Sequence, residues 1–450
     1  MMRHRFSMCV VLIIAAALLG FGWNIVGSTA AFEAQVASTY SAAENEVTPH
    51  FPETITFSLQ GETPFELERV ELLYSIADNP TLRLATPPFE SGSTIEISHN
   101  LNLLVNFIPV GVDVTYQWRL TGTDGSVAET EPRSFTWQDD RFDWQSVTND
   151  QVTVYSYNGN EAFSGLILET AQGTVDRLRT DFGVEEVPPI RIWAYKSTED
   201  FRGTQMSNSE SWIAGTAYPQ YHVILAVLPE GDKYEVGRIV PHEISHQVLY
   251  EATRNPFNSP PIWLDEGLAV LNQDAGDEDF PALVQNAADQ GRLFSVRALI
   301  ATPPLDPADA TLYYAESLSV VRFIVDHFGA DRIAALIDAY RLGISHDEAA
   351  ERALGVDLTE LDRLWKASLG YQGDRGQAGG VSLGSGGRDG GASLLASGVL
   401  IMAIAAVAAV VVGVVTIRRS RRTNEEEQDE DPSGHIPGTA IEESAGSYSG

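Results

Sequence analysis

Cysteine is almost absent from this sequence, because Cys9 is the only one among 450 residues. It lies in an apolar segment near the N-terminus, too early in that segment for a lipoprotein cysteine. The rest of the chain therefore has no disulfide framework, no cysteine-based metal site and no thiol catalysis.

Positive charge is also scarce, since 29 Lys and Arg residues stand against 62 Asp and Glu, for a formal net charge of −33. This balance argues against nucleic acid as a partner and against binding of anionic lipid through a basic patch. It fits a soluble, acid-coated exterior domain. Attraction of basic substrates by the acidic surface is the alternative reading.

The N-terminal segment, residues 1–31, has the features of a secretory signal. Arg3 and Arg5 precede an apolar run at 9–21, and small residues follow at 28–31. This order is typical of a cleaved signal peptide. An uncleaved anchor helix is the alternative.

The next two segments differ in pattern. Residues 32–47 are small and polar, which predicts a linker. Residues 48–140 contain short runs of alternating polarity, such as 54–59 and 114–120, separated by Gly and Asp. Such runs favour a small antiparallel β-sandwich, immunoglobulin-like or fibronectin-like. It contains no cluster of catalytic residue types, so we expect a spacer or a substrate-presenting module.

The C-terminal segments predict a membrane anchor. A Gly-rich linker at 373–393 precedes residues 394–417, an uncharged apolar run of 24 residues that is long enough to span a bilayer. Arg418 and Arg419 follow at once, which places the acidic tail at 418–450 in the cytoplasm. With the signal, this predicts a single-pass protein of the cell membrane with its remaining domains outside.

The chemistry of the chain centres on His242, Glu243 and His246, which form an HExxH motif. On a helix, positions i and i+4 lie on the same face, so both imidazoles can reach one metal ion. Glu243 lies beside that face, where it can act as a general base toward water. The motif is that of zinc proteases.

The surrounding sequence supports a folded site. An apolar run at 221–227 predicts a buried strand before the motif, and apolar residues at helical spacing surround it. Pro261 opens a second predicted helix that carries acids beside Trp263, a suitable place for a third ligand. Pro241 lies inside the motif helix, where we expect a tolerated kink in its second turn.

The paired motifs resemble the peptidase MA-like metallohydrolases of bacteria, which are gluzincins. HExxH is followed by Trp-Leu-Asp-Glu-Gly-Leu-Ala at 263–269, and the segment is similar to thermolysin and the zinc aminopeptidases. The resemblance covers residues 142–371. It implies one zinc ion bound by His242, His246 and Glu266, with Glu243 as the catalytic base.

The fold class that follows is multidomain α+β. Residues 141–372 should form a gluzincin-like peptidase domain, with a mixed sheet-helix lobe, a helical lobe of four amphipathic helices between 312 and 369, and zinc between the lobes. Residues 212–217 are expected either to bind peptide as an edge strand or to be an ordinary sheet edge.

Further roles are implied for three residues. In similar families a tyrosine or histidine of the helical lobe donates to the oxyanion, and Tyr314, or else Tyr313, stands in that place. Either of them could equally be a packed helix residue. Asp265 could orient a histidine ligand or simply be solvated.

The predicted function is hydrolysis of peptide bonds by a membrane-anchored zinc metallopeptidase whose partner is a peptide or protein substrate. The run Gly-Thr-Ala-Tyr-Pro at 215–219 lacks the acid that holds the substrate amino group in the similar aminopeptidases, which favours an endopeptidase. A zinc aminopeptidase is one alternative. A non-catalytic surface binding or adhesion protein with a structural zinc site is the other.

Overall fold

The computed structural model describes residues 38–371, apart from 64, 78, 80, 91, 93, 158–159 and 206–213. The predicted signal at 1–31, the Gly-rich linker, the apolar segment at 394–417 and the acidic tail lie outside the described residues. Within the described part, none of the helices combines the length and the apolar character needed to cross a bilayer.

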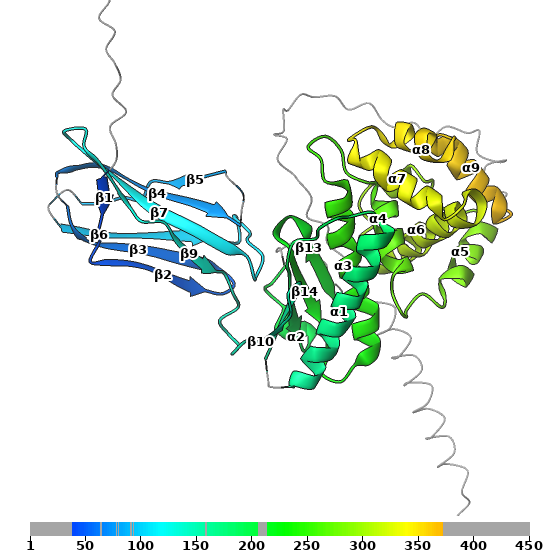
Figure 1. Ribbon diagram of the computed structural model, residues 1–450, viewed down its shortest axis with the longest axis horizontal. Coiled ribbons are helices and arrows are strands. Elements are labelled where there is room, and N and C mark those ends of the chain that lie inside the picture. Colours follow the sequence, from blue (N-terminus) through cyan, green and yellow to red (C-terminus); the bar gives the residue numbers. More distant parts are fainter. Residues whose placement is uncertain are drawn as a thin grey trace, which may run out of the picture.

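The first part of the described chain, residues 38–136, consists of β-strands in two sheets (Figure 1). One sheet is antiparallel, with the order β2-β3-β6. The other has the order β1-β8-β7-β4-β5, with β9 also pairing with β7. The strands are β1 (Ser38–Tyr40), β2 (Glu44–His50), β3 (Thr54–Glu62), β4 (Leu67–Ile76), β5 (Arg83–Ala85), β6 (Thr94–Asn102), β7 (Asp113–Gly122), β8 (Val127–Thr130) and β9 (Arg133–Thr136).

The two sheets pack face to face as a sandwich because alternate residues of their strands are apolar. β7 alternates buried and half-buried residues along its whole length. The ring of Phe57 on β3 lies 5.1 Å from Tyr116 on β7 and 6.3 Å from Tyr74 on β4. The antiparallel β region predicted from the alternation is confirmed.

The sandwich begins earlier in the chain than the sequence suggested. β1 and β2 start at Ser38 and Glu44, inside the stretch that we expected to be a linker. β1 pairs in parallel with β8, and the buried Tyr40 donates to the carbonyl of Glu62 at 2.8 Å. One tyrosine in a small, polar stretch thus anchors a strand that the local composition does not indicate.

A five-stranded mixed sheet follows, in the order β10-β11-β12-β14-β13. β11, β12 and β14 are parallel, whereas β10 and β13 are antiparallel strands at the two edges. The strands are β10 (Gln145–Thr148), β11 (Val152–Ser156), β12 (Ile190–Tyr195), β13 (Gly215–Tyr218) and β14 (Val223–Val227).

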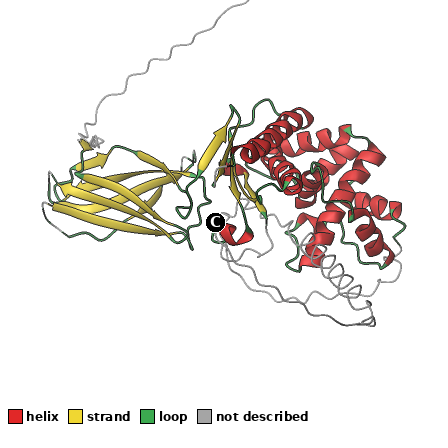
Figure 2. Cartoon of the chain, turned by 90° about the horizontal axis from the view of Figure 1, so that it is seen from below, coloured by secondary structure: helices red, strands yellow, loops and turns green. Residues whose placement is uncertain are grey.

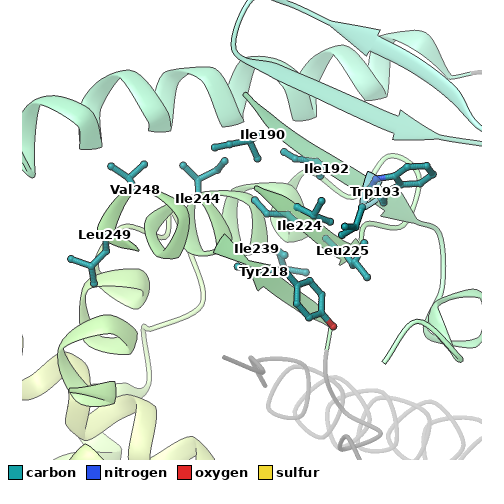
Figure 3. Close-up of a cluster of buried hydrophobic side chains, with 14 of the residues drawn as sticks. Ile190, Ile192, Trp193, Tyr218, Ile224, Leu225, Ile239, Ile244, Val248 and Leu249 are labelled. Atoms are coloured by element: carbon teal, nitrogen blue, oxygen red, sulfur yellow. The ribbon is translucent and has the colours of Figure 1, made fainter. Parts of the chain in front are cut away.

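Helices α1 (Glu161–Asp181) and α3 (Lys233–Thr253) pack against each other and against this sheet. Asn160 caps α1 by accepting from the N–H of Phe163, and Gly183 follows its end with a φ of +67°. Ile192 and Ile224 of the sheet lie close to Ile244 of α3 in a continuous apolar core (Figure 3). This core fixes the motif helix on the sheet.

The last part of the described chain is helical. It contains α4 (Ile262–Leu271), α5 (Phe280–Asp289), α6 (Pro307–Phe328), α7 (Asp331–Arg341), α8 (His346–Leu354) and α9 (Leu358–Ser368), and a short α2 (Thr198–Phe201) lies in the sheet region. The four predicted helices correspond to α6–α9, although α6 begins five residues earlier, at Pro307 rather than 312. Figure 2 shows strands at one end of the molecule, helices at the other, and the mixed sheet between them.

The sandwich is joined to the mixed sheet by polar and apolar contacts. Arg191 on β12 donates to the carbonyl of Gly111 at 2.9 Å and to the carboxylate of Asp113 at 2.7 Å. Gly111 has a φ of +91° and lies against the indole of Trp193, so that no side chain fits there. The sandwich and the mixed sheet therefore share an interface at β12.

Candidate metal centre

Two helices bring the predicted ligands together. His242 and His246 lie one turn apart on α3, and Asp232 caps that helix by accepting from the N–H of Glu235. Glu266 lies on α4, which packs against α3. One ligand atom from each of the three residues lies within 4.8 Å of the others, and all three residues are buried. Within the described residues this is the one such metal-binding group.

The atoms that face one another in this group have no partners. Nε2 of His242 and Nε2 of His246 lie 3.6 Å and 3.8 Å from Oε2 of Glu266. Both nitrogens and both oxygens of Glu266 are buried without a hydrogen bond. Buried polar atoms are normally satisfied, so four unsatisfied atoms converging on one point fit a cation that would bind them. Two imidazole nitrogens and one carboxylate are a donor set that suits zinc.

The other ring nitrogen of each histidine, Nδ1, is hydrogen-bonded to a neighbouring side chain. Nδ1 of His246 lies 2.5 Å from Oδ1 of Asp265, which decides between the two alternatives for this acid, because it orients the ligand. Nδ1 of His242 lies 2.6 Å from the side-chain amide of Gln273. Gln273 could not be singled out from the sequence, because a glutamine in a polar stretch after a helix is indistinguishable from a solvated one.

Burial and neighbouring charges shift the pKa values of the two histidines in opposite directions. Burial, with the positive charges of His246 and Arg238, holds the pKa of His242 well below its ordinary value, so this imidazole is neutral and ready to bind a metal. Burial also acts to lower the pKa of His246, but the charge and hydrogen bond of Asp265 override it and raise the pKa to about 9. Burial raises the pKa of Glu266 well above its ordinary value.

Glu243 lies between the metal-binding group and the edge of the sheet. Its carboxylate accepts a hydrogen bond from the N–H of Ala217 on β13, while Oε2 has no partner. A side chain at Gly215 would collide with this carboxylate, so glycine permits the close approach of β13. Burial raises the pKa of Glu243 to about 7, a value at which a carboxyl group can both take and return a proton.

The tyrosines of α6 are both buried. The hydroxyl of Tyr313 lies within hydrogen-bond distance of the carbonyls of Leu299, at 2.5 Å, and Ala301, at 2.8 Å. Burial raises the pKa of Tyr313, and the negative charges of Glu266 and Asp265 raise it further. A donor role for Tyr314 toward an oxyanion stays a prediction.

Comparison with known proteins agrees with this geometry. The model of the peptidase MA superfamily matches residues 170–371. No curated protein matches the chain.

Similar solved structures are distant. A bromine derivative of BhCBM56 is 12% identical, with a TM-score of 0.17, over 22% of this chain and 97% of that one. The polysaccharide deacetylase BC0361 from Bacillus cereus and BA0330 from Bacillus anthracis are 10% and 12% identical, with TM-scores of 0.20. Each is matched over 35% of this chain and 52% of its own length. Scores of this size support no argument about fold or function.

The resemblance deduced from the paired motifs is thus confirmed by a family match that spans both of them. Residues 170–371 are a metallopeptidase domain of the peptidase MA superfamily, and His242, His246 and Glu266 are its metal-binding group.

Proposed function

We propose that the protein is a zinc endopeptidase, exported and anchored in the cell membrane by its C-terminal segment. The observation that carries the activity is the Oε2 atom of Glu243, which is buried without a hydrogen bond beside a group that has three protein ligands among the described residues. A structural zinc site usually fills its fourth position with protein and has no use for a buried base. The non-catalytic adhesion alternative is disfavoured for this reason.

The residues divide the chemistry among them. His242, His246 and Glu266 would hold the zinc ion, whose Lewis acidity activates water and polarises a carbonyl group. Glu243 accepts the proton of the attacking water at Oε2 and then delivers it to the leaving amine. Asp265 and Gln273 keep the two imidazoles oriented while this happens.

An extended peptide would lie along β13, the edge strand of the mixed sheet. Among the described strands β13 pairs with β14 alone, and the N–H of Ala217 donates to the carboxylate of Glu243. A substrate backbone added at this edge would pass directly beside the general base. All four residues of β13, Gly-Thr-Ala-Tyr, are uncharged, so this strand offers no acid to fix a substrate amino group. That absence favours an endopeptidase over an aminopeptidase.

Membrane anchoring rests on the sequence alone. The signal at 1–31, the apolar run at 394–417 and the arginines after it support an extracellular peptidase domain and a cytoplasmic tail. The sandwich, which we take to be immunoglobulin-like or fibronectin-like, would then also lie outside the cell, as a spacer or substrate-presenting module.

Mass spectrometry of the products of a peptide library tests the proposal on the full-length protein. We expect internal cuts that a chelator abolishes and that Glu243→Gln does not make. Release of single N-terminal residues would instead support the aminopeptidase, and an inert, zinc-loaded protein would support the binding protein. Protease accessibility of tags at the two termini of membrane-inserted protein tests the topology.

A further inference from the structure

The turn at 272–274, directly after α4, contacts the metal ligand His242. Gln273 lies two residues after the end of α4, and its amide lies 2.6 Å from Nδ1 of His242. His242 is 0% exposed. Its ring is therefore shielded from bulk solvent, and Gln273 is the partner of its Nδ1.

The metal-binding role of His242 fixes the direction of this hydrogen bond. Nε2 faces Glu266 and must keep its lone pair to bind a metal, so the proton of the neutral ring sits on Nδ1. The N–H at Nδ1 then donates to the amide oxygen of Gln273. The structure places the amide nitrogen of Gln273 at Nδ1. The nitrogen and oxygen of a glutamine amide have nearly the same shape, so a flip of the amide brings its oxygen to the same position.

The turn that carries Gln273 is attached to α3 on both sides of it. Asn272 donates from its side chain to the hydroxyl of Ser245 at 3.2 Å and to the carbonyl of Leu268 at 2.8 Å. The N–H of Asp274 donates to the carbonyl of Gly237 at 3.0 Å. His242 lies between Gly237 and Ser245 along α3, so the two attachments flank the ligand.

Pro241 explains why the carbonyl of Gly237 is free to accept. In an α-helix the carbonyl of residue 237 would accept from the N–H of residue 241. Proline has no N–H and its ring displaces that carbonyl. Gly237 has no side chain, and a Cβ there would lie 3.4 Å from Cβ of Asp274, in van der Waals contact with the turn. The two residues form a notch in α3 into which the turn fits.

We infer that Gln273 is a positioning residue for the metal centre, and that the notch formed by Pro241 and Gly237 anchors it. The turn at 272–274 docks in the notch, and Gln273 then holds His242 in the tautomer and orientation that a metal needs. The two histidine ligands therefore have different partners at Nδ1. Asp265 polarises His246 with a carboxylate, and Gln273 polarises His242 with an amide. The inference rests on the metal centre of the proposed peptidase, and its test therefore measures metal affinity.

Competition of the full-length protein with a chromogenic chelator gives the zinc dissociation constant of each variant. Gln273→Leu replaces the amide with an apolar group and removes the acceptor, so we expect zinc affinity to fall about 10- to 100-fold. Gln273→Glu keeps an acceptor and should restore affinity to within about threefold of the original. Gln285→Leu, at an exposed glutamine of α5, is the matched control and should change nothing.

Pro241→Ala tests the anchor. It returns an N–H that competes for the carbonyl of Gly237, so zinc affinity should fall about threefold or more while the metal-free protein melts at the same or a higher temperature. In the background of Gln273→Leu, where no amide remains to be positioned, Pro241→Ala should cause no further loss.

Three results would overturn the inference. These are an unchanged zinc affinity in Gln273→Leu, a loss in Gln273→Glu equal to that in Gln273→Leu, or the same loss from Pro241→Ala in both backgrounds. None of them depends on peptide hydrolysis. A protein that binds zinc as expected and cleaves nothing would contradict the proposed function while leaving this inference intact.

Discussion

At the scale of single residues, the site is defined by which buried polar atoms have partners. Nδ1 of His246 and Nδ1 of His242 are hydrogen-bonded to Asp265 and Gln273. Their Nε2 atoms and both carboxylate oxygens of Glu266 have no hydrogen bond. Leaving such atoms unpaired in a core costs free energy, so their convergence is the physical signature of a metal site.

Glu243→Gln separates binding from turnover. The amide fits the same space but cannot accept a proton, so we expect the variant to bind zinc as the original does and kcat to fall about 10²- to 10⁴-fold. Zinc content and peptide hydrolysis, measured on the same preparation, check both halves. Retained zinc together with undiminished hydrolysis would remove Glu243 from its assigned role.

Glu316 gives a prediction about pH. It is fully buried on α6, accepts from the N–H of Phe294 at 3.0 Å, and burial raises its pKa to about 8. The folded state therefore keeps a proton that the unfolded chain releases near its ordinary pKa of 4.5. Between these two values the unfolded state binds fewer protons, so the stability from this group falls as pH rises, by at most about 1.4 kcal/mol per pH unit.

Glu316→Gln is neutral at every pH and can still accept from Phe294. Urea denaturation of the metal-free protein between pH 5 and 8 should show that the variant gains stability over the original as pH rises. Parallel pH dependences of the two proteins would contradict the assignment.

At the scale of secondary-structure elements, α4 completes the site that α3 begins. It supplies Glu266, carries Asp265 behind His246 and ends in the turn that holds Gln273. Its position depends on a close approach to α6, because a Cβ at Gly267 would lie 2.5 Å from the carbonyl oxygen of Ser317. A small residue beside the ligand is therefore required by packing.

Gly267→Ala should displace α4 from α6. We expect a loss of about 1–3 kcal/mol in stability from overpacking and a weaker zinc site, since Glu266 is the adjacent residue. Gly173→Ala is the control, because it lies on the exposed side of α1 with nothing within 4 Å of an added Cβ. It should gain about 0.5–1 kcal/mol. Equal effects of the two substitutions on zinc affinity would show that α4 is not held in this way.

Much of this level could be predicted from the sequence. Apolar spacing predicted α3 and the last four helices, although α3 is buried on all sides from Arg238 to Leu249. The HExxH motif and a glutamate on the next predicted helix predicted the ligands. The turn of Gln273 could not be predicted, since it depends on contacts between α3 and residues about thirty positions away. Pro241 could be seen inside the predicted helix, but the sequence does not show that the carbonyl it leaves free, that of Gly237, accepts from the N–H of Asp274.

At the scale of the whole molecule, the sandwich is tied to the sheet that carries the site. Arg191 bonds to both Gly111 and Asp113, and the ring of Phe107 lies 6.0 Å from Tyr218 at the end of β13. The sandwich thus touches the edge strand along which we place the substrate.

Arg191→Met should weaken this attachment by about 1–2 kcal/mol, because it removes a charge-assisted pair of hydrogen bonds. In calorimetry we expect the sandwich and the peptidase domain to unfold as more separate transitions, with zinc affinity unchanged. Arg119→Met is a matched control, because Arg119 pairs with Glu129 at 2.6 Å within the sandwich and is about as exposed. It should cost less than about 1 kcal/mol and leave the transitions as they were. Identical melting profiles of the two variants would show that the attachment at Arg191 does not couple the two parts.

The most direct test of the central claim measures zinc and peptide hydrolysis together on the purified full-length protein, before and after chelation and after zinc is returned. We expect one zinc ion per chain, hydrolysis that disappears on chelation and returns with zinc, and neither property in Glu266→Ala. Hydrolysis that survives complete removal of the metal, or zinc that binds equally well without Glu266, would contradict a metallopeptidase centred on His242, His246 and Glu266.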